Sequence, residues 1–132
     1  QTGAAAAQLA APPMGMTVHD PMEGIDDFAE TAAIIANLDL VISVDTSVVH
    51  LAGAMGRTVF LLDRYDNCWR WLSGRADSPW YPSMTIFRQD RIHDWSGPMT
   101  RIVAAVEALA AFRGGPATQP HPSPKRALAD AA

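Results

Sequence analysis

The alternation of apolar and polar positions along the chain predicts buried strands separated by helices. Four short runs are apolar and nearly free of charge, which predicts strands over residues 16–19, 40–44, 58–62 and 84–88. Apolar residues at three- and four-residue spacing predict helices over residues 27–38, 46–55 and 99–112. Uninterrupted apolar strands are typical of parallel sheets that are covered on both faces. The order of the elements therefore predicts an α/β fold with a doubly wound parallel sheet.

Two of these helices carry more detailed signals. Asp27 and Glu30 have the spacing of a capping box, in which each side chain accepts a hydrogen bond from a free backbone N–H at a helix start. In the last helix, the residues expected to face inward are Ile102, Val103, Val106, Leu109 and Ala110.

The length of 132 residues fits one domain, which we place at residues 1–112. Residues 113–132 are rich in glycine, proline and alanine, and this composition predicts a disordered tail. Because the chain begins with Gln1 and not with methionine, we expect it to be a piece of a longer protein.

Charge and composition exclude several classes of protein. A net charge of −4 gives no basic footprint for nucleic acid, so no nucleic-acid partner is expected. Cys68 is the one cysteine, which fits a reducing compartment. Since neither a transmembrane segment nor a signal peptide is recognisable, we expect a cytoplasmic location.

The strongest candidate site lies where the 40–44 strand meets the following helix. Asp45, Thr46 and Ser47 stand at that junction, and His50 lies one turn further along the same helix face as Thr46. Strand ends in parallel sheets are where ligands bind, and a helix N-terminus favours phosphate. We therefore predict these four residues to bind substrate. The structural alternative is that Asp45 or Thr46 caps the helix and that His50 is a half-buried packing residue.

A long segment from Asp63 to Ser83 is the second candidate. It combines arginines with aromatic side chains, and the candidate contacts to a ligand are Arg64, Trp69, Arg70 and Trp71. Aromatic rings could stack on a nucleotide base or sugar. The alternative is that the tryptophans cover the sheet or pack against a partner domain.

Other motifs are missing from the sequence. The four histidines do not have the spacing of metal ligands, so no metal site is predicted, and no cofactor is expected. No glycine-rich dinucleotide fingerprint follows a strand, and there is no P-loop. Cys68 has no histidine near it in the sequence, which argues against a catalytic thiol.

Taken together, these segments resemble a known family. Residues 27–56, with Asp45-Thr-Ser-Val-Val-His50, resemble the C-terminal half of heptosyltransferase-like glycosyltransferases, glycosyltransferase family 9. Three further segments look like the bacterial subgroup with upstream tetratricopeptide repeats: Trp-Arg-Trp-Leu at 69–72, Asp-Ser-Pro-Trp-Tyr-Pro-Ser-Met at 77–84 and Phe-Arg-Gln at 87–89. The resemblance extends over about residues 1–112.

The resemblance implies a GT-B fold, in which two Rossmann-like domains face a cleft and the C-terminal one binds a nucleotide-diphospho-sugar donor. It implies metal-independent sugar transfer, with Asp45, Thr46, Ser47 and His50 matching the donor-binding motif. Heptosyltransferases usually have glycine after the Asp-Thr pair, where this chain has Ser47. No catalytic residue is assigned here, because the acceptor site and the catalytic base are expected in an N-terminal domain. The chain alone is therefore expected to be inactive, and that domain and upstream tetratricopeptide repeats are its expected partners.

Two other classes of function remain open from the sequence. One is a non-catalytic module that binds sugar nucleotides or acts as a scaffold. The other is a flavodoxin-like regulatory domain organised around Asp45. A regulatory domain should carry a lysine near a later strand end, whereas Lys125 in the tail is the single lysine of this chain.

Overall fold

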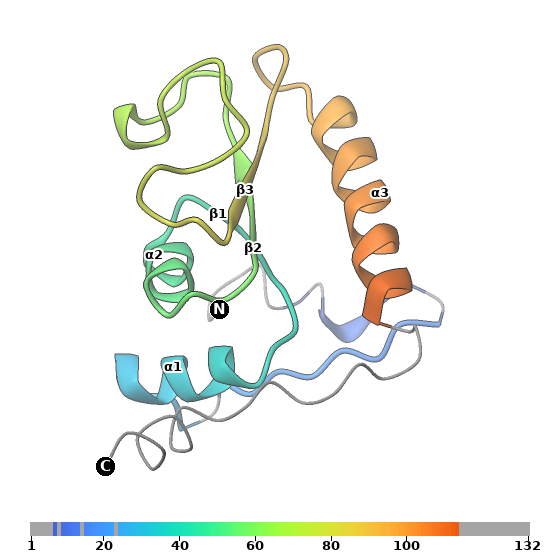
Figure 1. The fold of residues 1–132 in the computed structure, drawn as a ribbon. Coiled ribbons are helices and arrows are strands. Elements are labelled where there is room, and N and C mark those ends of the chain that lie inside the picture. Colours follow the sequence, from blue (N-terminus) through green and yellow to red (C-terminus); the bar gives the residue numbers. More distant parts are fainter. Residues whose placement is uncertain (1–6, 8, 14, 23, 114–132) are drawn as a thin grey trace, which may run out of the picture.

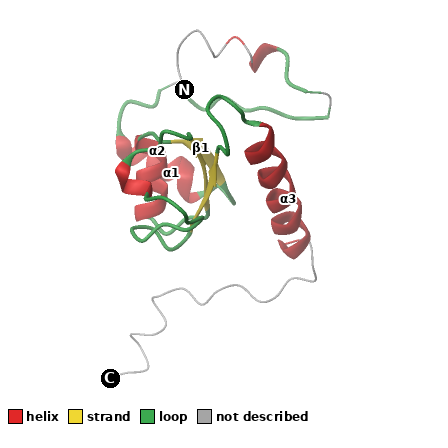
Figure 2. Cartoon of the chain, turned by 90° about the horizontal axis from the view of Figure 1, so that it is seen from above, coloured by secondary structure: helices red, strands yellow, loops and turns green. Residues whose placement is uncertain are grey.

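The computed structural model describes residues 7, 9–13, 15–22 and 24–113 of the chain. Within these residues three parallel strands form one sheet, in the order β1 (Val41–Val44), β2 (Val59–Asp63) and β3 (Met84–Arg88). Figures 1 and 2 show helices on both faces of this sheet. One face carries α1 (Phe28–Ala36) and α2 (Ser47–Ala54), and the other carries α3 (Ser96–Arg113). The predicted α/β fold with a covered parallel sheet is confirmed.

The two faces of the sheet bury different side chains because neighbouring residues of a strand point to opposite sides. Val59 and Leu61 of β2 are fully buried on the α2 side, together with Val49 of α2. Phe60 lies on the opposite side, where it packs against Phe87 of β3 and the α3 helix. Both faces of β2 are thus apolar, which explains the uninterrupted apolar run in its sequence.

The crossover connection from β2 to β3 is a long loop with little helix. Two parallel neighbours need a crossover connection, which is usually a helix. Here residues 64–83 hold only the short 3₁₀ helix η2 (Trp69–Trp71). Trp71 is fully buried in the core on the α2 side, so its large side chain fills space that a crossover helix would fill.

The helix starts follow local capping chemistry. Asp27 accepts a hydrogen bond from the backbone N–H of Glu30 at 2.8 Å, and the Glu30 carboxylate accepts from the N–H of Asp26 at 2.7 Å. The predicted capping box is confirmed, with its return bond one residue earlier than the usual pattern. The last helix begins at Ser96, three residues before the predicted start at 99, where Asp94 accepts from the N–H of Ser96 at 2.9 Å.

Two predictions about secondary structure and burial were wrong. Residues 16–19 form no strand, because their backbone finds no neighbouring strand to pair with, and Met16 and Val18 are exposed. On α3, Val103 and Ala110 are exposed, because the helix packs mainly against β3 and leaves that side of its surface uncovered. The predicted tail falls almost entirely on residues 114–132, outside the described residues.

Candidate functional site at the strand ends

The junction between β1 and α2 leaves Thr46 with an unusual role. Its backbone is extended, as at a helix N-cap, but its side chain makes no capping hydrogen bond. Instead its hydroxyl oxygen lies 3.3 Å from that of Ser43 at the end of β1. Ser47 follows as the first residue of α2 and is exposed. The Thr46 hydroxyl therefore does not cap α2, and the backbone carbonyl of Thr46 accepts from the N–H of Val49 at 3.2 Å. The N–H groups of Ser47 and Val48 at the helix start have no partner in the described residues.

Asp45 is the centre of a cluster of polar and charged side chains. One carboxylate oxygen lies 3.4 Å from Nε2 of His50, and the other lies 3.5 Å from a guanidinium nitrogen of Arg70. The second ring nitrogen of His50, Nδ1, lies 3.0 Å from the hydroxyl of Tyr81. Both nitrogens of His50 therefore face protein groups.

The 64–83 loop brings aromatic rings against the same histidine. The ring of His50 stacks on that of Trp71 with 5.2 Å between centroids and 20° between planes. Tyr81 meets His50 edge-on at 5.8 Å. The loop thus encloses one side of the histidine while Asp45 stays open to the strand ends.

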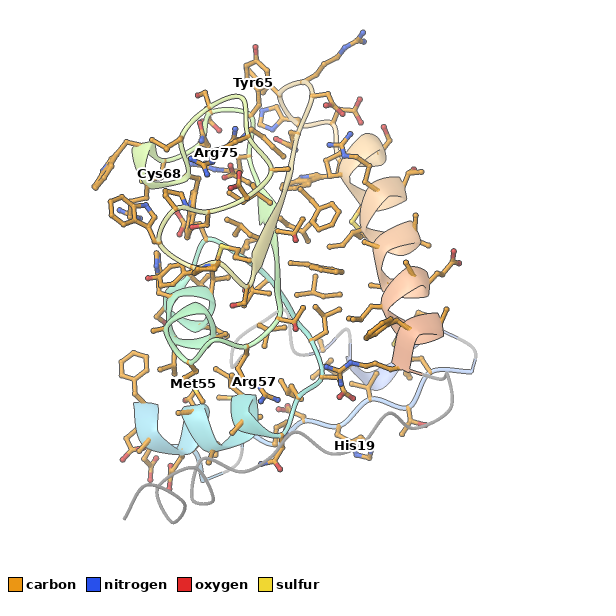
Figure 3. The ribbon with its side chains drawn as sticks, in the orientation of Figure 1. His19, Met55, Arg57, Tyr65, Cys68 and Arg75 are labelled. Carbon is orange, nitrogen blue, oxygen red and sulfur yellow. The ribbon has the colours of Figure 1, made fainter. Side chains whose placement is uncertain are left out.

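Asp45 also lines a hollow of about 370 Å³ at the carboxyl ends of β1 and β2. The residues around the hollow are Val44, Asp45, Leu62, Asp63, Arg64, Asp66, Asn67, Cys68 and Trp95. Figure 3 shows the labelled Tyr65 and Cys68 at this end of the ribbon, with Met55 and Arg57 at the opposite end. Three aspartates and one arginine line the hollow. The guanidinium of the arginine, Arg64, lies 3.6 Å from the carboxylate of Asp66. Because the Asp63 carboxylate is buried against Arg88, the carboxylates of the lining that remain accessible are those of Asp45 and Asp66.

Asp63 is both a lining residue of the hollow and a buried residue of the fold. Its carboxylate is 3% exposed and accepts a 2.7 Å hydrogen bond from Nε of Arg88. Burial raises the pKa of Asp63 above its ordinary value, and the Arg88 guanidinium opposes that rise. Arg88 also donates to the backbone carbonyl of Trp71 at 3.2 Å, so this pair anchors the loop to the sheet.

The four predicted loop contacts have different surroundings. Trp69 is 72% exposed, with the guanidinium of Arg70 5.9 Å from its ring centre. Arg64 is exposed at the rim of the hollow. Trp71 is fully buried, so it reaches the site only through the rings it packs against. Arg70 contacts Asp45 and thereby joins the loop to the predicted donor motif.

Several residues around the hollow were not singled out from the sequence. Asp63 follows the apolar part of β2 as Asp45 follows β1, so applying the strand-end rule to every strand would have found it. Trp95 comes from the segment before α3, and no local signal connects it to the other strand ends. Among the described residues, no group of three or more histidine, cysteine or acidic side chains could hold a metal ion.

A comparison with protein families matches residues 22–96 to glycosyltransferase family 9 (heptosyltransferase). The match covers more than half of the 132 residues and includes all three strands and the 64–83 loop. The chain belongs to glycosyltransferase family 9. Family 9 membership confirms the family predicted from the motifs and supports a glycosyltransferase interpretation over a regulatory domain.

Other comparisons add one relative. Protein FlbA of Caulobacter vibrioides (strain ATCC 19089 / CIP 103742 / CB 15) is 36% identical over 101 residues, which are 74% of this family 9 chain and 16% of FlbA. The chain thus spans about one sixth of the length of this curated relative. No solved structure matches the chain. None of the helices in the described part of the chain has the length and apolar content needed to cross a bilayer.

Proposed function

We propose that this chain is the nucleotide-diphospho-sugar-binding half of a GT-B glycosyltransferase. The observation that carries the proposal is the hollow at the strand ends of a family 9 chain, with Asp45 open to it and the start of α2 beside it. Ligands of parallel α/β sheets bind at this edge. The donor sugar and its nucleotide are the substrate that the family implies.

Two parts of the site suit two parts of such a donor. The first turn of α2 offers free N–H groups, a partial positive charge and the hydroxyls of Thr46 and Ser47, which together suit a diphosphate. The carboxylate of Asp45, in the acidic lining of the hollow, accepts hydrogen bonds and suits hydroxyls of a sugar or ribose. Arg70 stands beside Asp45 and places positive charge near the same opening.

In the proposed reaction, the bond between the anomeric carbon and the diphosphate oxygen breaks, and its electron pair leaves with the diphosphate. An acceptor oxygen bonds to the anomeric carbon and gives its proton to a base in the other domain. Groups fixed in advance around the leaving diphosphate lower the barrier by stabilising its charge. The sequence predicted His50 as a direct ligand of the diphosphate. Because its ring nitrogens face Asp45 and Tyr81, we assign His50 the role of positioning the Asp45 carboxylate.

Calorimetric titration of the chain with UDP, ADP and GDP tests the proposal. We expect at least one diphosphate to bind at millimolar concentration or below. Thr46→Val should weaken that binding by about 2- to 13-fold, the worth of one neutral hydrogen bond. Thr85→Val, a change at an exposed threonine on β3, is the matched control and should leave the affinity unchanged. Binding of no diphosphate, or an equal loss in both variants, would overturn the assignment.

A turnover assay addresses the whole protein. The GT-B cleft needs two domains, so the chain alone should release no nucleoside diphosphate from sugar nucleotides above background. The protein that also contains the acceptor domain should release it. Clear transfer by the chain alone would contradict the two-domain site. The upstream tetratricopeptide repeats and the cytoplasmic location stay predictions.

A further inference from the structure

The face of α2 that meets the 64–83 loop carries a glycine where the loop comes closest. A Cβ atom on Gly53 would lie 2.5 Å from Cγ of Tyr81 and 2.8 and 2.9 Å from its two Cδ atoms. Real Cβ contacts are never this short, so the phenol ring rests directly on the helix backbone. Gly53 lies three residues after His50, on the same side of the helix. The missing side chain therefore brings Tyr81 within reach of the histidine.

The position of Tyr81 is fixed from the loop side as well. Its N–H lies 3.3 Å from the hydroxyl of Ser78, which is buried, and its carbonyl accepts from the N–H of Met84 at the start of β3. Its ring also lies 6.4 Å from the ring of Trp71. With its backbone held and its ring seated on Gly53, the hydroxyl reaches Nδ1 of His50 at 3.0 Å.

The hydrogen-bonding chemistry of Asp45 and Tyr81 selects one tautomer of the neutral His50 ring. An ionised Asp45 carboxylate only accepts hydrogen bonds, so the ring nitrogen facing it is the one that should carry the proton. Nδ1 is then the acceptor, and the hydroxyl of Tyr81 is its donor. If Nδ1 carried the proton instead, Nε2 would face the Asp45 carboxylate with a lone pair in place of an N–H.

We propose that Tyr81, seated on Gly53, is a positioning residue of the donor site. Its hydroxyl holds the ring of His50 with Nε2 facing Asp45 at 3.4 Å, and this fixes the carboxylate of Asp45, a residue that lines the hollow. Tyr81 does not line the hollow itself, so it acts through these two side chains. The consequence for binding rests on the proposed function, whereas the state of the His50 ring can be measured without any ligand.

Nitrogen NMR of the histidine rings tests this arrangement in the 132-residue chain, at a pH where the rings are neutral. The His50→Gln variant identifies the His50 signals among the four histidines. We expect a protonated Nε2 and an unprotonated Nδ1 in the wild type. Tyr81→Phe, which keeps the ring on Gly53 and removes the hydroxyl, should move the two nitrogen shifts toward each other. A protonated Nδ1 in the wild type, or an unchanged pattern in Tyr81→Phe, would overturn the proposal.

A change at Tyr65 provides the matched control, since this residue is exposed and its hydroxyl makes no hydrogen bond within the described part of the chain. Tyr65→Phe should leave the His50 signals and diphosphate affinity unchanged, whereas Tyr81→Phe should weaken binding by about 2- to 13-fold. A changed tautomer with unchanged affinity would refute the positioning role. If the wild type binds no diphosphate, the proposed function fails, and the ring signals still decide whether Tyr81 sets the state of His50.

Discussion

Gly53→Ala adds one methyl group at the point where α2 touches the ring of Tyr81. The new Cβ would lie 2.5–2.9 Å from three ring carbons, so the ring must move. Overpacking of this kind costs about 1–3 kcal/mol. Displacing the ring also breaks the hydrogen bond to His50, worth about 0.5–1.5 kcal/mol.

Alanine also favours the helix over glycine by about 1 kcal/mol, which offsets part of this loss. The three contributions combine to a net destabilisation of about 0.5–3.5 kcal/mol. In a Tyr81→Ala background the clash and the hydrogen bond are both gone. There Gly53→Ala should stabilise the chain by about 1 kcal/mol, so the sign of the effect reverses.

Urea denaturation of the wild type, both single variants and the double variant measures this reversal. Ala54→Gly, at an exposed position of the same helix, is the control, and it should cost up to about 1 kcal/mol in either background. If Gly53→Ala stabilises the chain while Tyr81 is present, the close approach of ring and helix does not exist in solution.

Three other predictions concern contacts elsewhere in the fold. Asp63→Ala should destabilise the chain by about 1–3 kcal/mol, because the guanidinium of Arg88 loses the acceptor of its 2.7 Å hydrogen bond in a mostly buried place. Burial raises the pKa of Asp63, so the folded chain binds this proton more tightly than the unfolded chain. In urea denaturation the stability of the wild type should therefore fall as pH rises through the folded-state pKa, and Asp63→Asn should lack that fall. Asp27→Ala should cost about 0.5–2 kcal/mol through loss of the α1 cap, visible as a lower thermal midpoint. Iodide should quench the exposed Trp69 and leave the buried Trp71 protected, so a quenchable fraction that survives Trp69→Phe unchanged would contradict the loop structure.

The fold follows largely from signals that are local in the sequence. The β-branched and apolar runs at β1, β2 and β3 were long enough, and free enough of charge, to mark strands buried on both faces. The run at 16–19 is similar in composition, yet a strand also needs a neighbour, and pairing cannot be inferred from four residues. The side of α3 that faces the sheet was predicted correctly at Ile102 and Val106 and wrongly at Val103 and Ala110, because apolar residues surround most of the helix.

The candidate site was only partly predictable, because its contacts join distant segments. Asp45 and His50 are only five residues apart, with Asp45 just before the N-cap of the helix that carries His50, so their contact is local in the sequence. Arg70 and Tyr81 reach them from a loop without regular structure, over separations of 25 and 31 residues. Nor could the sequence decide which tryptophan of the loop enters the core. Trp71 does so because the crossover lacks a helix and needs a large side chain there.

Amide NMR of the labelled chain during titration with UDP, ADP and GDP tests the central claim most directly. The account predicts that the amide signals of residues 45–50 at the β1–α2 junction and of residues 62–64 and 66–68, which line the hollow, shift together with added diphosphate. The hollow against α1, lined by Ile25, Glu30, Ala33, Ile34, Asn37 and Leu38, provides an internal comparison. Absence of any shift at millimolar diphosphate, or shifts confined to residues 25–38, would contradict donor binding at the strand ends.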